Sequence, residues 1–131
     1  MKHNDLFLLR YIFSSDDDGN PVEDIYVGYD EKFNLIVLIE HTDYDAPEYN
    51  CCAYAVIKKD DAFSLAKRLK VSMTDLPDIV GDSVDDEYYE IINPTIRQTQ
   101  ECFHEILECF VNEKCRFRLI RIYGASGYTC F

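Results

Sequence analysis

The run Phe33–Ile39 (FNLIVLI) constrains the fold most, because it is nearly continuous in apolar residues and has polar residues on both sides. A run of this kind is typical of a central strand that is covered on both faces. Three further apolar or aromatic stretches, Leu6–Phe13, Asp24–Tyr29 and Cys51–Ile57, are separated by polar turn segments. Because the links between these four stretches are short, we predict strands that pair consecutively in an antiparallel meander.

After residue 59 the apolar residues recur with helical rather than strand spacing. Asp60 or Asp61 can cap a first helix, since a carboxylate accepts hydrogen bonds from the free amides of the first turn. The apolar side of this helix carries Ala62, Leu65, Ala66 and Leu69. A second short helix is expected from Ser72, with Pro77 in its first turn and Gly81 at its end.

Residues 82–92 are acidic, and we expect them to form a link with a short edge strand around Tyr88–Ile92. The pair Asn93-Pro94 has the chemistry of a helix start, because Asn caps well and Pro fits the first helical position. The long helix that begins there extends to about Asn112.

The stretch Arg116–Tyr123 (RFRLIRIY) predicts a closing strand. The chain as a whole therefore predicts an α+β fold with an antiparallel sheet of five to six strands and two to three helices packed mainly on one face. No internal repeat or linker divides it, so we expect one domain over residues 1–131.

The long helix has one ionisable side and one apolar side, and this arrangement determines how we interpret the residues of ECFHEILEC. One side carries Glu101, His104, Glu105 and Glu108, and the opposite side carries Phe103, Ile106, Leu107 and Phe110. Glu101 and His104 have the Glu-x-x-His spacing of di-metal centres, but such ligands point into the core of a four-helix bundle. We predict a solvated helix face, and we expect no metal and no cofactor.

The six cysteines lack the CxxC spacing of zinc or redox sites. We predict that all of them are reduced and mostly buried as small hydrophobic side chains. They are Cys51, Cys52, Cys102, Cys109, Cys115 and Cys130.

The segment Asp16-x-Asp18-x-Asn20 imitates the start of a calcium-binding loop. Pro21 stands where that loop needs glycine, and Val27 stands where it needs a bidentate glutamate. The pattern therefore favours a solvated turn over a calcium site.

A small hydrolase is an alternative function that the sequence leaves open. His41 and Asp43 precede Cys51 and Cys52 by about ten residues, and His104 offers a second imidazole. A Cys–His nucleophilic arrangement depends on spatial proximity, so spacing along the chain does not decide it. No motif in the sequence requires an enzyme.

The net charge of -12 is concentrated in two segments: residues 14–50 have a net charge of -10 and residues 71–93 a net charge of -7. Nucleic acid is a poor partner for such a chain, since its binding depends on Lys and Arg neutralising phosphates. Anionic membranes are disfavoured for the same reason. The apolar run near the N-terminus is broken by Arg10, too early for a signal peptide or a membrane span, so we expect a cytoplasmic location.

Tyrosines stand beside the acidic residues of both segments, a combination of charge and rigid contact area that is common at binding hot spots. We expect these residues to converge into a single surface that binds a basic protein. The candidate partner-binding residues are Asp43, Tyr44, Asp45, Glu48, Tyr49, Asp85, Asp86, Glu87 and Tyr88.

In size, acidity and mixed architecture, though in no motif, the chain is similar to immunity proteins that neutralise nuclease toxins. The leading hypothesis is a small cytoplasmic protein-binding module that caps a basic nuclease or nucleic-acid-binding partner. Besides the hydrolase, a self-associating structural subunit is a further alternative, and the chain is expected to be a monomer or a homodimer.

Overall fold

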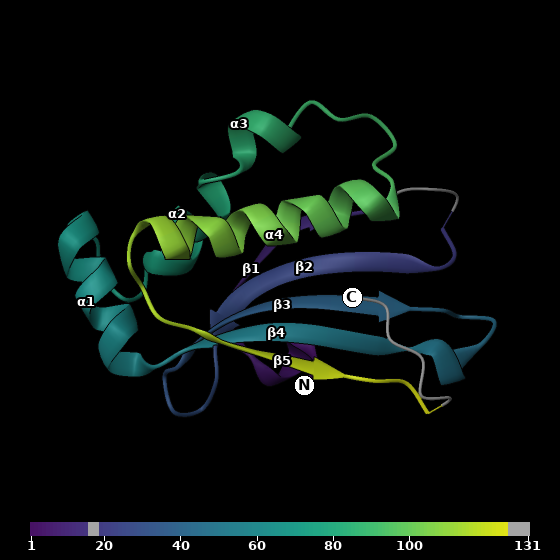
Figure 1. The fold of residues 1–131 in the computed structure, drawn as a ribbon, viewed down its shortest axis with the longest axis horizontal. Helices are drawn as coiled ribbons and strands as arrows, with labels where there is room; N and C mark the ends of the chain where they lie inside the picture. The colour runs from purple at the N-terminus through teal and green to yellow at the C-terminus, as the bar shows by residue number, and fades with distance from the viewer. Residues whose placement is uncertain (16–18, 126–131) are drawn as a thin grey trace.

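The computed structural model describes residues 1–15 and 19–125, which form a five-stranded antiparallel sheet with helices on one face (Figure 1). The strands are β1 (Phe7–Ser14), β2 (Val22–Tyr29), β3 (Leu35–Thr42), β4 (Cys51–Ile57) and β5 (Arg118–Ile122). They lie in the order β1-β2-β3-β4-β5, so each strand pairs with the next one along the chain. The predicted meander is confirmed.

Four α-helices and two short 3-10 helices complete the described residues. They are α1 (Lys59–Leu69), α2 (Leu76–Asp82), α3 (Asp85–Tyr88), α4 (Ile96–Asn112), η1 (His3–Asp5) and η2 (Pro47–Tyr49). The α+β fold class is confirmed. The expected edge strand at Tyr88–Ile92 is wrong, because the acidic link folds instead as the short helix α3.

The main core lies between the sheet and the helices. Alternate side chains of the three central strands enter it, so that Val27 of β2, Val37 of β3 and Ala55 of β4 lie in one row across the sheet, each at most 1% exposed. Phe103, Ile106 and Phe110 of α4 belong to the same cluster. Burying this apolar face is what holds α4 on the sheet.

The central strand β3 is covered on both faces, as its continuous apolar run predicts. Residues 35–39 are all buried, and those that point away from the helices join a smaller cluster on the outer face of the sheet. That cluster contains Leu6, Ile36, Leu38 and Cys52, with Met1, Tyr54 and Val56 packed against it.

Three helix ends differ from the predictions. The helix α1 begins at Lys59, so Lys58 rather than Asp60 or Asp61 stands at its N-cap, and no side chain caps it. The helix α4 begins at Ile96, because Thr95 rather than Asn93 caps it in a reciprocal pair of hydrogen bonds with Gln98. Gly81 does not end α2, which continues for one more residue to Asp82.

The two sides of α4 are as predicted. Glu101, His104 and Glu108 are exposed and Glu105 is half-buried, while Ile106 and the neighbouring apolar residues are buried. In the described parts of the chain, none of the helices has the length and apolar character needed to cross a bilayer. Asp16 and Asp18 of the calcium-like turn lie outside the described residues.

Candidate functional site

The connection from β3 to β4, residues 43–50, is an ordered acidic loop. The side chain of Asp43 accepts hydrogen bonds from the backbone N–H groups of Asp45 and Ala46, both at 3.0 Å. At the other end, Asn50 accepts a hydrogen bond of 2.7 Å from the N–H of Asp43. These contacts hold the loop in a defined turn before any partner arrives.

Asn20, two residues before β2, ties this acidic loop to the neighbouring turn. Its amide nitrogen donates to Asp43 at 3.2 Å and to Asp45 at 2.9 Å, while its carbonyl accepts from the N–H of Tyr44 at 2.8 Å. A single amide therefore orients two carboxylates and one backbone group. Sequence reasoning missed this residue, because the contact joins segments more than twenty residues apart.

The acidic loop presents both charge and aromatic surface to solvent. Tyr44 is 70% exposed and Tyr49 is 41% exposed, and Asp45 and Glu48 are exposed beside them. Desolvation acts to raise the pKa of Asp43, but the hydrogen bonds from Ala46, Asn20 and Asp45 outweigh it and lower that pKa. Five of the predicted partner-binding residues thus lie together here.

A hollow of about 530 Å³ adjoins this loop on the outer face of the sheet. Its lining includes Asp24 and Tyr26 of β2, Glu40 of β3 and Tyr44 of the loop. His3 closes one side, where its ring stacks on Tyr26 with centroids 4.5 Å apart and its Nδ1 lies 2.6 Å from Glu40 Oε1. Two carboxylates and two phenol rings therefore line one cavity, which we call the outer hollow.

Burial shifts the pKa values of two residues that line the outer hollow. Desolvation raises the pKa of Asp24, and the nearby Glu40 adds to this shift. Desolvation, followed by the charges of Asp24 and Glu40, raises the pKa of Tyr26 to about 12, so its phenol stays neutral. The alternation of Asp24 and Tyr26 with the buried Ile25 and Val27 was a period-two signal that would have placed these residues on one face.

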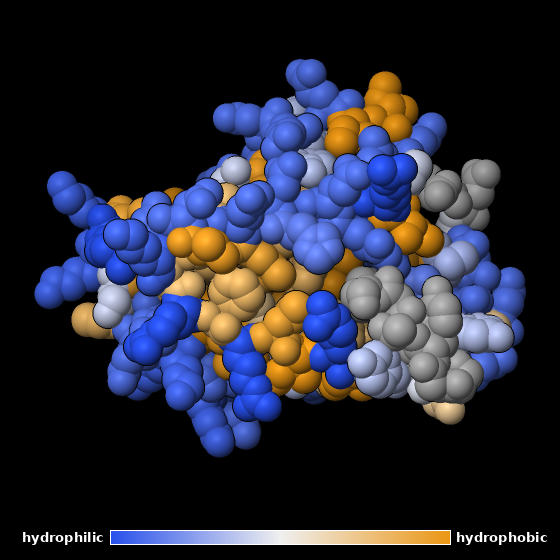
Figure 2. All heavy atoms as spheres, in the orientation of Figure 1, coloured by the Kyte–Doolittle hydropathy of each residue, from blue (hydrophilic) through white to orange (hydrophobic). Residues whose placement is uncertain are grey.

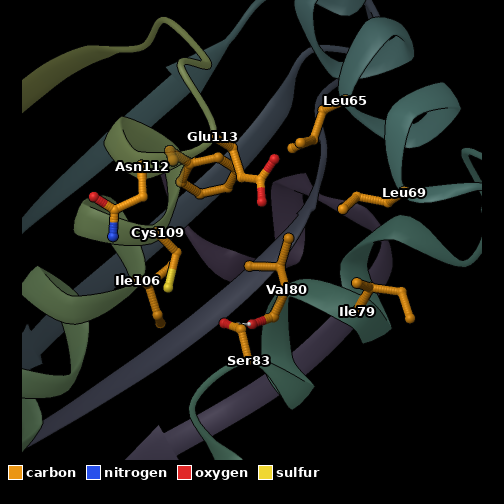
Figure 3. A pocket seen from close by; sticks show the side chains of 10 residues that line it. Leu65, Leu69, Ile79, Val80, Ser83, Ile106, Cys109, Asn112 and Glu113 are labelled. Carbon is orange, nitrogen blue, oxygen red and sulfur yellow. Dashed lines mark hydrogen bonds between the residues drawn. The ribbon is translucent and has the colours of Figure 1, made fainter.

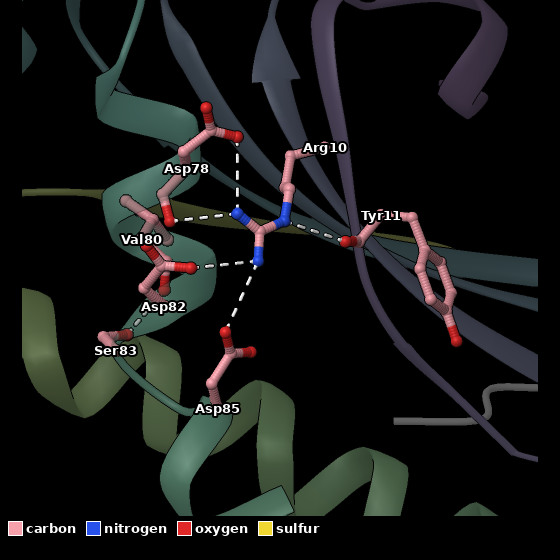
Figure 4. Close-up of polar contacts among 7 residues, drawn as sticks. All are labelled: Arg10, Tyr11, Asp78, Val80, Asp82, Ser83 and Asp85. Carbon is pink, nitrogen blue, oxygen red and sulfur yellow. Dashed lines mark hydrogen bonds and ion pairs between the residues drawn. The ribbon is translucent and has the colours of Figure 1, made fainter. Parts of the chain in front are cut away.

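The second acidic segment is arranged differently, because three of its seven carboxylates share one cation within the molecule. Arg10 of β1 points at the end of α2, where its guanidinium lies 3.3 Å from Asp78 and 3.1 Å from Asp82, and it also reaches Asp85 of α3 at 3.6 Å (Figure 4). One cation thus holds three carboxylates and fastens the helices to the edge of the sheet. Asp85 is therefore already engaged within the molecule.

The remaining predicted residues of this segment divide between surface and core. Asp86 and Glu87 are exposed. Tyr88 is only 7% exposed and packs edge-on against Phe13 with ring centroids 5.3 Å apart, so the expectation that it lies on a contact surface is wrong. The exposed ring is its neighbour Tyr89, at 84%, which follows from the rotation of one residue along a helix.

The two acidic segments do not form one surface. The acidic loop and η2 lie at the end of the sheet where β3 gives way to β4, whereas α3 lies beyond the helix layer (Figure 1). The expected convergence into a single patch is therefore wrong, because the sheet and α4 separate the two segments. The acidic loop with the outer hollow is the candidate site.

Beneath α4, Glu23 and His41 form a buried pair. His41 Nδ1 lies 2.6 Å from Glu23 Oε2, which also accepts a 3.2 Å hydrogen bond from Gln100. Glu23 is 0% exposed, and its Oε1 has no hydrogen-bond partner among the described residues. A carboxylate that orients an imidazole is half of the arrangement that the hydrolase alternative needs.

The cysteines do not supply the nucleophile that the hydrolase alternative also needs. Cys51 lies opposite His41 in the sheet, but it is disulfide-bonded, which corrects the expectation that it is reduced. Cys52 is free and points to the outer face, where burial raises the pKa of its thiol. Cys102, Cys109 and Cys115 are free as expected, and Cys130 lies outside the described residues.

A second hollow, of about 320 Å³, lies between α1, α2 and α4 (Figure 3). Apolar side chains such as Leu65, Ile79 and Ile106 form most of its wall, and Glu113 stands at its rim. The Ser83 hydroxyl in its lining donates to the Val80 carbonyl at 2.6 Å. No histidine lines this hollow, so it offers apolar burial rather than acid–base chemistry.

Within residues 1–15 and 19–125, no group of three or more His, Cys, Asp or Glu side chains has a geometry that would hold a metal ion. Comparison of the chain with protein families, with curated proteins and with solved structures finds no match.

Proposed function

We propose that this chain is a small acidic protein-binding module that caps a basic surface of another protein through the acidic loop and the outer hollow. The observation that carries the proposal is the outer hollow itself, which is lined by Asp24, by Glu40 with its partner His3 and by two phenol rings, beside a pre-ordered acidic turn. This arrangement suits the side chain of an arginine or lysine.

The order of the acidic loop supports the proposal energetically. Binding loses free energy whenever flexible side chains and loops must be fixed at the interface. Here Asn20 and Asn50 already hold the backbone of the loop and the carboxylates of Asp43 and Asp45 in one arrangement. Fixing the loop on binding then costs less free energy.

The chemistry of the outer hollow supports a cationic ligand. A carboxylate attracts a guanidinium or ammonium group, and a tyrosine ring attracts the same cation through its π face. Tyr44 lines the hollow from the loop side and Tyr26 from the sheet side. An arginine inserted between them would meet rings and carboxylates together.

In this proposal the partner is a nuclease or another nucleic-acid-binding protein, and the module acts as an immunity-type antagonist. Such partners carry Lys and Arg clusters that normally hold phosphates. The carboxylates of Asp45 and Glu48 would occupy positions otherwise taken by phosphates, which blocks the basic surface by charge and by bulk. Electrostatic steering would make association fast at low salt and slower as salt rises.

The experiment is affinity capture from native lysate at low and at high salt, with three immobilised proteins compared side by side. The first is the wild type. The second carries Tyr44→Ala with Glu48→Gln, and the third is a matched control that carries Tyr89→Ala with Glu90→Gln on the separate acidic segment. We expect one basic protein to be retained by the wild type and the control, to be lost from the loop variant, and to elute at high salt. Equal retention by the loop variant would refute the assignment of the site.

A cytoplasmic location belongs to this proposal, and the disulfide at Cys51 counts against it, since disulfides persist mainly in oxidising compartments. Alkylation of the protein under denaturing conditions in freshly lysed cells, before and after reduction, decides the matter. One additional cysteine pair labelled only after reduction would place the protein in an oxidising compartment, and complete labelling beforehand would support the cytoplasm.

A further inference from the structure

The two edges of the sheet differ in their readiness to accept another strand. At one edge, β1 pairs with β2 through two register shifts, and Leu8 has a φ of 50°, so this strand is bulged. Bulges of this kind are a common protection of edge strands against pairing with other chains. Arg10 also fastens β1 to α2 from the side.

At the other edge, β5 is regular and open. Its five residues pair consecutively with β4, from Arg118 opposite Val56 to Ile122 opposite Cys52, without a shift. No strand of the described residues pairs with its outer side. A regular edge of this kind presents a row of backbone N–H and C=O groups that can hydrogen-bond to an extended segment.

The charge of this edge is opposite to that of the rest of the molecule. Residues 114–123 contain four basic side chains and no acidic one, in a chain whose net charge is -12. Arg118 and Arg121 of β5 are exposed, and strongly hydrophilic groups line β5 beside the apolar side chains that lie between this strand and α4 (Figure 2). An acidic ligand is therefore favoured here by local charge complementarity.

A hollow of about 310 Å³ at the start of β5 adds a pocket for a side chain. It is lined by Val56, Lys58, Asp61, Arg116, Phe117 and Arg118. Its single carboxylate, Asp61, lies 3.5 Å from Arg116, whose side chain is 88% exposed, so cations outnumber anions in the lining. A carboxylate of an incoming strand fits this hollow.

We propose that the outer edge of β5 binds an extended acidic segment of another protein by strand addition, with one of its carboxylates in the hollow at Lys58, Arg116 and Arg118. Backbone hydrogen bonds to β5 supply affinity, and Arg118 and Arg121, which point to opposite faces of the sheet, each attract an acidic side chain of the added strand. This surface is opposite in charge to the acidic loop and meets the outer hollow only at Ile122, the last residue of β5. The two tests stay distinguishable because Arg118 and Arg121 do not line the outer hollow.

The probe is a fluorescein-labelled octapeptide, Glu-Glu-Val-Val repeated twice, which carries Glu on both faces when extended. The comparison is the same peptide with Lys in place of Glu, and binding is followed by fluorescence anisotropy. We expect the acidic peptide to bind and the basic one not to bind at this edge. The double variant Arg118→Glu with Arg121→Glu should weaken binding by about tenfold or more, because two attractive charges become repulsive. The matched control, Arg97→Glu with Lys32→Glu, makes the same change of net charge elsewhere and should stay within about twofold.

Amide hydrogen exchange separates strand addition from simple charge attraction. Bound peptide should slow exchange at several amides of residues 118–122, and circular dichroism verifies that each variant folds. Equal weakening by the control would show attraction to overall charge only and would overturn the proposal. So would peptide binding without protection of β5, displacement of the peptide by inorganic phosphate alone, or a concentration-dependent dimer that occupies this edge in sedimentation.

Discussion

The buried pair of Glu23 and His41 allows a sharp test of the energetics of this fold. We expect Glu23→Leu and His41→Leu each to destabilise the protein strongly, and the double variant to recover most of the loss. The reason is that each single change leaves an ionisable or polar partner buried without its 2.6 Å contact, whereas the double change replaces both by apolar groups of similar size.

The magnitude follows from the burial of the pair. Glu23 is 0% exposed and His41 is 7% exposed, so water cannot replace the lost partner. Removing one member of a buried pair of hydrogen-bonded ionisable groups costs up to about 3–5 kcal/mol, while replacing both by apolar residues is often neutral or stabilising. The orphaned Oε1 of Glu23 adds to the expected gain in the double variant, since an unsatisfied buried oxygen disappears with the carboxylate.

The assay is urea unfolding of the wild type, both single variants and the double variant at neutral pH. With a slope of about 2 kcal/mol per molar urea, a single variant should lose roughly 1.5–2.5 M from its midpoint. The coupling free energy should then exceed about 2 kcal/mol. Single variants that lose less than about 1 kcal/mol, or losses that simply add in the double variant, would refute the argument that the pair is a coupled, desolvated unit.

Three further predictions concern the sheet edge, the core and pH. Arg10→Met should lower the free energy of unfolding by roughly 1–2 kcal/mol at low salt and by less at high salt, because three carboxylates lose their shared cation. Urea midpoints at two salt concentrations measure this loss, and a loss that does not depend on salt would contradict the prediction. Ile106→Ala should cost about 2–5 kcal/mol through cavity formation, whereas Glu108→Ala on the exposed face of the same helix should stay within about 0.5 kcal/mol by the same assay. Burial raises the pKa of Tyr29 to about 12, so the folded state keeps this phenol protonated at a pH where the unfolded chain loses the proton. The contribution of Tyr29 to the free energy of unfolding should therefore be fully present below pH 10 and be lost as the pH rises toward 12. In thermal melts, Tyr29→Phe should make the fall of the midpoint with pH less steep.

The elements with a strong hydrophobic pattern were predictable from the sequence. The run Cys51–Ile57 is a strand with those bounds, because polar residues end its apolar pattern on both sides. The buried face of α4 likewise follows from helical periodicity alone. Its start does not: Asn93 and Thr95 both have capping side chains, and Thr95 caps the helix because Gln98 can complete the reciprocal pair.

The link before α4 was not predictable, because its outcome depends on tertiary packing. The residues around Tyr88 suit either a short strand or a helical turn by local propensity. The ring of Tyr88 packs on Phe13, a residue of β1 far away in sequence, and this contact favours the helical turn that directs the ring inward. Local pattern contains no information on that neighbour.

The residue types of the candidate site were predictable from the sequence, but the contacts that order these residues were not. Clustered acids and tyrosines identified the acidic loop, but the residue that orders it, Asn20, reaches it across the turn between two strands. Arg10 is a similar case, because its carboxylate partner Asp82 is 72 residues away. Pairings over such distances are set by sheet topology, which residue spacing alone does not specify.

These long-range contacts change what the net charge means for recognition. Counted by segment, both acidic stretches appear equally able to attract a basic partner. In the fold, however, Arg10 engages Asp78, Asp82 and Asp85, so a partner at that segment would have to compete with an internal cation. The acidic loop has an amide in the corresponding place, and Asn20 orients its carboxylates without neutralising them. A partner that binds Asp43 and Asp45 would therefore not have to displace a cation of the kind that Arg10 supplies, and Asn20→Lys, which introduces such a cation, should weaken salt-sensitive capture.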